Sequence, residues 1–144
     1  MLTAFVLGPT LAHLLELPAK LRLDRPDYLV AQQLYRGWAF IGIPLYLAII
    51  LIGVLAFSLW HAGRNWGWAL AALGFLIAAQ VVFWVWTFPA NAATAQWTVL
   101  PDNWEALRRQ WEFSHAAGAA CTFLALACLV ISLLADRISR PARA

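Results

Sequence analysis

The chain has 144 residues, of which 63% are hydrophobic and 12% are charged, and its formal net charge is +3. Soluble domains carry about a quarter of charged residues, whereas here the apolar residues fall in runs of about 20, the length that crosses a bilayer. This composition excludes an ordinary soluble domain. Because the cations flank the apolar runs instead of forming a patch, we expect no nucleic-acid partner.

The apolar runs predict four transmembrane helices, over about residues 2–18, 38–60, 67–88 and 103–135. After the first run, Asp24 followed by Pro26 is a typical helix start, and the segment behind it predicts a short interfacial helix that leads directly into the second run. Pro89 is expected to end the third helix. The chain is therefore predicted to be all-α, an up-down four-helix integral membrane bundle forming a single domain over residues 1–144.

Both chain ends of such a bundle lie on one side of the membrane, here called side B. The opposite side, side A, holds the interfacial helix and the loop of residues 89–101. The cations to be compared are, on side A, Lys20, Arg22, Arg25, Arg36, Arg108 and Arg109 and, on side B, Arg64, Arg137, Arg140 and Arg143. The positive-inside rule favours side A as cytoplasmic, and we expect the protein in the bacterial inner membrane.

The first and fourth predicted spans contain mirrored pairs of ionisable residues. His13 stands three residues before Glu16, and Glu112 stands three residues before His115. This spacing places each pair on one face of its helix. Because the two spans run in opposite directions, we expect His13 to face His115 and Glu16 to face Glu112. The four residues are the candidate catalytic site, and a basic residue one turn away in each span is expected at the side-A rim.

Ionisable groups at membrane depth cost at least about 2.5–3.5 kcal/mol each, so these four should compensate one another. One arrangement is a transition-metal site for iron, copper, zinc or manganese, with His13, Glu16, Glu112 and His115 as ligands. A second is a metal-free site that takes a proton from a phenol or an activated methylene. A third is structural, with Glu16–Lys20 and Arg108–Glu112 ion pairs and histidines that hydrogen-bond between helices.

Further polar and aromatic residues are expected around this site. If the third helix continues past Pro89, several of them lie on one of its faces. The candidate substrate-binding residues are Tyr46, Gln80, Trp84, Asn91, Trp97 and Trp111. The side-A loop that contains Trp97 would cover the site. The expected partners are membrane lipid and a lipophilic small molecule, with other membrane subunits or a homo-oligomer left open.

Part of the chain resembles a known family. The pattern Pro89-x-Asn91, Trp97, Pro101 and Arg108-x-x-Trp111-x-x-x-His115 is similar to that of small four-helix membrane proteins related to fungal anthrone oxygenases. The resemblance covers Phe88 to about Ala120. Members often have an arginine one turn after the histidine, where this chain has Gly118 and Ala119. The resemblance implies an oxygen-dependent oxidation of a polycyclic phenol.

Two functional hypotheses follow from these features. The first is a membrane-embedded oxidoreductase or oxygenase-like protein that acts on a lipophilic aromatic or quinone-like molecule at the His/Glu site between the first and fourth helices. The alternative is a non-catalytic small subunit or assembly partner of a larger membrane complex. A chain with short loops and no soluble domain suits that role, because its only sizeable surface faces lipid.

Overall fold

The computed structural model describes residues 1–138, the last two by their backbone alone, and no strand occurs among them. The elements in chain order are α1 (Leu2–Lys20), α2 (Arg25–Gln33), the 3-10 helix η1 (Trp38–Ile41), α3 (Gly42–His61), α4 (Gly67–Val82), the π-helix η2 (Phe83–Thr87), α5 (Phe88–Ala93) and α6 (Trp104–Ile138). The all-α class is confirmed. The stretches long and apolar enough to cross a membrane are Leu2–Lys20, Trp38–His61, Gly67–Ala93 and Trp104–Asp136.

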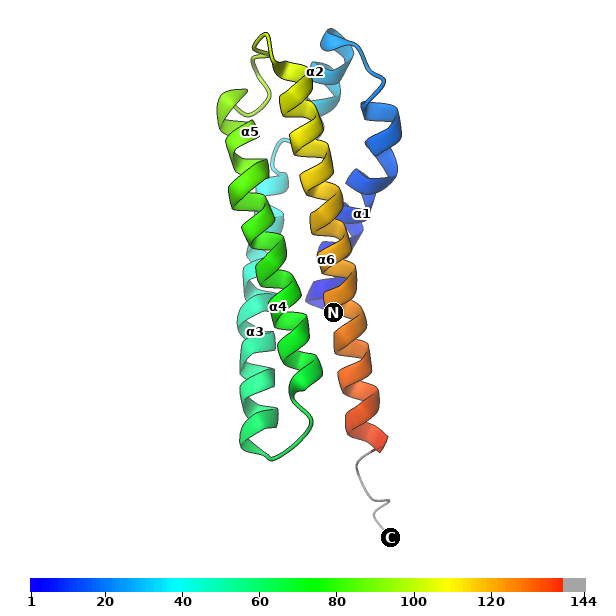
Figure 1. The fold of residues 1–144 in the computed structure, drawn as a ribbon, viewed down its shortest axis with the longest axis vertical. Helices are drawn as coiled ribbons and strands as arrows, with labels where there is room; N and C mark the ends of the chain where they lie inside the picture. The colour runs from blue at the N-terminus through cyan, green and yellow to red at the C-terminus, as the bar shows by residue number, and fades with distance from the viewer. Residues whose placement is uncertain (139–144) are drawn as a thin grey trace.

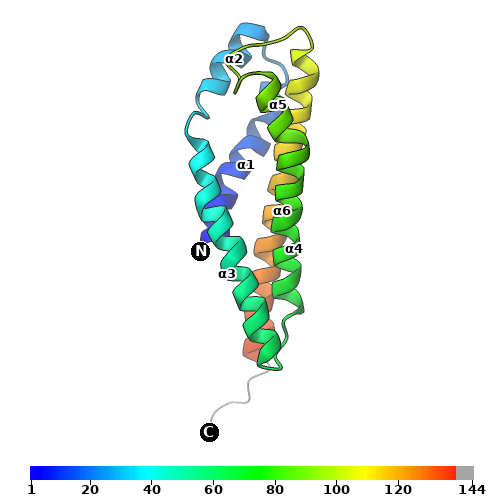
Figure 2. The ribbon, with the colours of Figure 1, turned by 90° about the vertical axis from the view of Figure 1, so that its left-hand side faces the viewer.

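The four long stretches form an up-down bundle (Figures 1 and 2). Helix α1 packs against α3 and α6, and α4 packs against the same two helices, so the first and last long helices are antiparallel neighbours. Helix α2 and the loop of residues 94–103 lie together at the side-A end. Helix α1 begins about half-way along the bundle and runs to that end. Its candidate site residues, His13 and Glu16, therefore lie in the side-A half.

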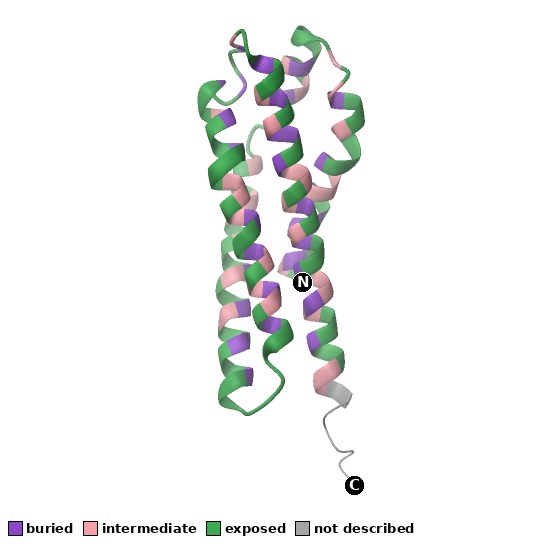
Figure 3. Ribbon diagram, viewed as in Figure 1, coloured by how far each residue is buried: buried purple, intermediate pink, exposed green. Residues whose placement is uncertain are grey.

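The interior changes character along the bundle. Towards side B, small and aliphatic side chains meet, which lets the helices approach closely; they are Ala48, Ile52, Ala72, Leu76, Ala125 and Cys128. Towards side A, the buried cluster is largely aromatic and consists of Tyr28, Ala90, Trp97, Leu100, Trp104 and Trp111. Figure 3 shows the buried residues on the inner faces and exposed residues along the outer ones. Large apolar side chains such as Ile50 and Leu133 remain exposed there, as lipid-facing residues would be.

Helix α2 begins as predicted but does not lead directly into the second span. The Asp24 side chain accepts a hydrogen bond of 3.0 Å from the Asp27 N–H, and Pro26 lies in the first turn. The helix ends at Gln33, and Gly37 adopts a left-handed backbone conformation with φ +86°. Glycine adopts such a conformation without the steric strain that a Cβ would bring. The chain therefore changes direction before η1, and α3 starts only at Gly42.

Pro89 does not end the third span, contrary to prediction. The π-helix η2 precedes it, and the Phe88 N–H bonds to the Phe83 carbonyl, five residues back. Pro89 then stands in the first turn of α5, where a residue without an N–H is tolerated, and the helix continues to Ala93. The wider π-turn also shifts the helix face, so that Thr87 and Ala90 are buried whereas Trp84 is exposed.

Helices α1 and α6 run in opposite directions, as the antiparallel arrangement requires. Helix α1 runs from the N-terminus towards side A, and α6 runs back towards side B (Figure 1). At the side-B end, Arg64 donates a hydrogen bond of 2.7 Å from Nε to Asp136 Oδ1, which ties the α3–α4 turn to α6. Arg140 and Arg143, counted above for side B, lie outside the described residues, as does the side chain of Arg137.

Candidate functional site

The expected contact between the two histidines is present. Helices α1 and α6 bring the rings of His13 and His115 to a centroid distance of 4.4 Å. His13 also contacts Tyr35, Trp38 and Trp111, with ring centroids 4.5, 5.1 and 5.0 Å away. It is buried, whereas His115 is half-buried. The two imidazoles thus meet in aromatic surroundings in the side-A half of the bundle.

The hydrogen-bond partners of the two rings assign them opposite tautomers. Nδ1 of His13 lies 3.3 Å from Nζ of Lys20, and an ammonium group can only donate, so this Nδ1 accepts and the ring carries its proton on Nε2. Nδ1 of His115 lies 2.9 Å from the Trp111 carbonyl oxygen, which can only accept, so this Nδ1 carries the proton. His13 therefore presents an N–H at Nε2, and His115 presents a lone pair.

Lys20 lies inside the bundle, not at its rim as predicted. The residue is 4% exposed. Its Nζ is 2.9 Å from Glu112 Oε2, an ion pair without hydrogen-bond alignment, and 3.6 Å from Glu16 Oε2. The ring centroids of Tyr35 and Trp111 lie 4.9 and 5.1 Å from the same atom. The buried carboxylate of Glu112 and the exposed one of Glu16 therefore share an ammonium group instead of facing each other, because two anions side by side would repel.

The second carboxylate oxygen of Glu112 is held by α2. Oε1 accepts a hydrogen bond of 3.0 Å from the Tyr28 hydroxyl, which in turn accepts one of 2.6 Å from Gln32 Nε2. Burial and then the charge of Glu112 raise the pKa of Tyr28 far above its usual range, so the phenol remains a donor. The Tyr35 hydroxyl donates to Glu16, and burial followed by this bond raises the pKa of Tyr35 as well.

These α2-side partners were missed by the sequence prediction. Tyr28, Gln32 and Tyr35 recur at intervals of four and three residues, which is the spacing of one helical face. That polar face on a short helix next to the first span was the available signal. A polar face of this kind indicates that the helix packs against polar side chains inside the bundle, here Glu112.

Arg108 does not form the predicted ion pair with Glu112. Its Nη1 donates to the carbonyl oxygens of Leu23, at 2.7 Å, and Lys20, at 3.4 Å. Its guanidinium carbon lies 4.6 Å from the Trp104 ring centroid. The last carbonyl groups of a helix lack partners within it and attract a cation. Arg108 therefore caps α1, and the neutralisation of Glu112 falls to Lys20.

Asn91 serves as a common acceptor for two tryptophans. Its Oδ1 accepts indole N–H bonds from Trp97, at 2.9 Å, and Trp111, at 2.8 Å. Ala95, Gln96 and Trp97 all have left-handed backbone conformations, with φ of 46, 58 and 59°. This loop is also held by a bond from Gln33 Nε2 to the Trp97 carbonyl, at 2.8 Å. Asn91 thus positions the aromatic wall and its covering loop; in this arrangement its oxygen is not directed at a substrate.

Tyr46, Trp84 and Gln80 are not brought to the histidines. Trp84 Nε1 lies 3.4 Å from the Tyr46 hydroxyl, and the two residues are 53% and 46% exposed on the outside of the bundle. Gln80 is half-buried in α4 and has no contact with the histidines among the described side chains. The reason is that α4 turns its face with Ala72, Leu76 and Ala79 inward. The predicted substrate-binding role of these three residues finds no geometric support.

The donor set does not fit a resident metal ion as it is arranged. Over the part of the chain whose side chains are described, no three His, Cys, Asp or Glu residues are grouped so that they could hold one. The Lys20 ammonium lies among the lone pairs of His13, Glu16 and Glu112 that a metal would need. The arrangement suits proton transfer and hydrogen bonding instead.

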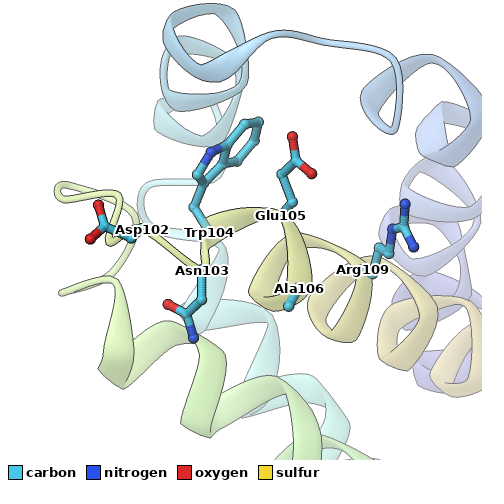
Figure 4. Close-up of a pocket in the computed structure, with 6 residues that line it drawn as sticks. All are labelled: Asp102, Asn103, Trp104, Glu105, Ala106 and Arg109. Atoms are coloured by element: carbon cyan, nitrogen blue, oxygen red, sulfur yellow. The ribbon is translucent and has the colours of Figure 1, made fainter.

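A concavity of about 480 Å³ lies at the start of α6, lined by Asp102, Asn103, Trp104, Glu105, Ala106 and Arg109. Figure 4 shows Asp102, Asn103 and Glu105 pointing in different directions. None of the lining residues belongs to the His/Glu site. Because its polar side chains do not converge, the concavity is not a candidate binding site, and it is separate from the site of His13, Glu16, Glu112 and His115.

Comparison with protein-family models, with curated proteins and with solved structures found no match for this chain.

Proposed function

We propose that the chain is an integral membrane protein that binds a lipophilic aromatic ketone, phenol or quinone-like molecule and takes a proton from it at His115. The four apolar stretches cross the bacterial inner membrane, with α2 at the side-A interface and side A towards the cytoplasm. Because Lys20 and Arg108 are buried, the cations left to count on side A are Arg22, Arg25, Arg36 and Arg109, as many as the sequence places on side B. The proposed orientation therefore rests on the weight of the first span, which Arg22 and Arg25 closely follow.

The observation that carries this proposal is the opposite proton placement on two adjacent imidazoles. His115 presents a lone pair at Nε2 and can act as a base, whereas His13 presents an N–H and can donate to an oxygen. Proton removal from a carbon conjugated with a carbonyl group is assisted by a base at the carbon and by a donor at the oxygen on which charge develops. Trp38 and Trp111 provide flat apolar surfaces for an aromatic molecule.

The reaction class that fits the pair is oxidation of an activated ring methylene by dioxygen, the class implied by the resemblance to anthrone oxygenases. His115 Nε2 takes one C–H proton, and the enolate oxygen accepts a hydrogen bond from His13 Nε2–H. Dioxygen then accepts the electrons of the enolate, and one of its atoms becomes the new carbonyl oxygen. The methylene carbon loses both of its hydrogens, and these leave with the second oxygen atom as one molecule of water.

The proposal is tested with anthrone as the probe, because its methylene is flanked by aromatic rings opposite a ketone. Oxygen uptake and anthraquinone formation are measured with the purified full chain in detergent micelles. We expect a rate above that of protein-free micelles, and a loss of about 100-fold or more in His115→Ala, the range for removal of a general base. His61→Ala, at the exposed last residue of α3, is the matched control.

Two results would count against the proposal: wild-type protein no faster than empty micelles, or His115→Ala as active as wild type. In the first case, co-purification with larger subunits at a fixed ratio would favour the role of assembly partner. Prolonged dialysis against a chelator is expected to leave the rate unchanged. If dialysis lowers the rate and one particular added metal ion restores it, then His13, Glu16, Glu112 and His115 bind that metal in a different arrangement from the one described.

A further inference from the structure

We propose that Lys20 and Glu16 form a proton route that connects the His13 imidazole with the outside of the bundle. The proposal rests on the function proposed above, since it describes how the His13 ring stays neutral when its Nε2 proton is given to an oxygen. Its physical basis is the position of one lysine between a buried imidazole and an exposed carboxylate.

Lys20 contacts three acceptors at once. Its Nζ lies 3.3 Å from His13 Nδ1, 2.9 Å from Glu112 Oε2 and 3.6 Å from Glu16 Oε2. An ammonium group has three hydrogens to donate; here it is hydrogen-bonded to His13 and forms ion pairs with the two carboxylates. A proton that moves along one of these contacts can be replaced along another.

Glu16 is the member of this group that reaches the surface. Its side chain is 47% exposed, whereas those of Lys20 and Glu112 are 5% and 0% exposed. Glu112 cannot pass a proton outward, because its other oxygen accepts from the buried Tyr28. The Tyr35 hydroxyl donates to Glu16 and holds its carboxylate beside Lys20. Protons therefore enter and leave at Glu16.

The transfer balances in atoms and charge. When His13 gives its Nε2 proton to an oxyanion, the Lys20 ammonium gives a proton to Nδ1 of the same ring. The resulting Lys20 amine takes a proton from the protonated Glu16 carboxyl group, which has taken one from water at the surface. One proton enters at Glu16 and one leaves at Nε2. When the ketone re-forms, its oxygen returns the proton to Nε2 and the other steps reverse: Lys20 passes a proton to Glu16 and takes one from Nδ1, which restores the Nε2–H tautomer.

The test follows exchange of the His13 ring N–H with deuterium oxide, in full-length protein with ¹⁵N-labelled histidine rings and without any substrate. We expect Glu16→Gln to slow this exchange about tenfold or more, the effect of ~1.4 kcal/mol of added barrier. Lys20→Arg should slow it as well, because arginine keeps the positive charge beside Glu112 but does not release a proton. Exchange at the exposed His61 should be unchanged in both variants.

Glu105→Gln, which neutralises an exposed carboxylate at the same end of the bundle, is the matched control and should leave His13 exchange at the wild-type rate. Wild-type exchange at His13 in Glu16→Gln would overturn the proposal, since that exposed substitution leaves the packing intact. The measurement needs no turnover. If Glu16→Gln slows His13 exchange but the wild-type protein does not oxidise anthrone, the proton route stands and the proposed reaction is rejected.

Discussion

Lys20 and Glu112 show how charge is kept inside an apolar bundle. Each is buried, their charged atoms are 2.9 Å apart, and each also contacts neutral groups, His13 or Tyr28. Removing one member of a buried ion pair leaves the other uncompensated, whereas removing both is often tolerated. Lys20 is therefore needed for stability as long as Glu112 is charged, and it is also a part of the proposed site.

Lys20→Met is expected to lower the free energy of unfolding by about 3–5 kcal/mol, because it leaves the Glu112 carboxylate buried without a cation. The double variant Lys20→Met/Glu112→Gln should recover most of this loss. Reversible unfolding in mixed micelles measures both. Arg22→Met, at an exposed cation just after α1, should change stability by about 0.5 kcal/mol or less. A double variant less stable than Lys20→Met would show that the charges are not coupled as described.

At the scale of the elements, capping residues and prolines in the sequence predicted where helices begin better than where they end. Asp24 and Pro26 act through neighbours in the sequence, and α2 begins where they indicate. Pro89 was misjudged because a proline ends a helix only if the preceding turns are α-helical. The π-turn of η2 accommodates it, and such a turn depends on packing against α6, which the sequence does not display.

The break between α2 and η1 depends on Gly37. A Cβ at this position would meet no atom within 4 Å, so the cost of Gly37→Ala comes from its φ of +86° alone. We expect a loss of roughly 1–2 kcal/mol in unfolding free energy. Gly118→Ala is the matched control: it too meets no atom within 4 Å but lies inside α6, where alanine should stabilise by about 0.5–1 kcal/mol. Equal effects in the two variants would contradict the assigned backbone conformation.

At the scale of the whole molecule, the part of the site that depends on helix direction was predictable. Antiparallel first and last spans with mirrored spacing bring His13 to His115. Which cation neutralises Glu112 was not predictable, because the sequence does not show that Arg108 binds the carbonyl oxygens of Lys20 and Leu23 while Lys20 turns inward to Glu112. Trp84 lies inside η2 and is exposed on the outside of the bundle, which its spacing from Gln80 in the sequence did not reveal.

The protonation pattern of the histidines exists only if α1 and α6 pack as described, so it tests the account most directly. Nitrogen NMR of full-length protein with ¹⁵N-labelled histidine rings distinguishes the two tautomers, and single His→Gln variants assign the signals. We predict a proton on Nε2 of His13 and on Nδ1 of His115, as their partners Lys20 and Trp111 require. The same tautomer on both rings would contradict the site and the function proposed from it.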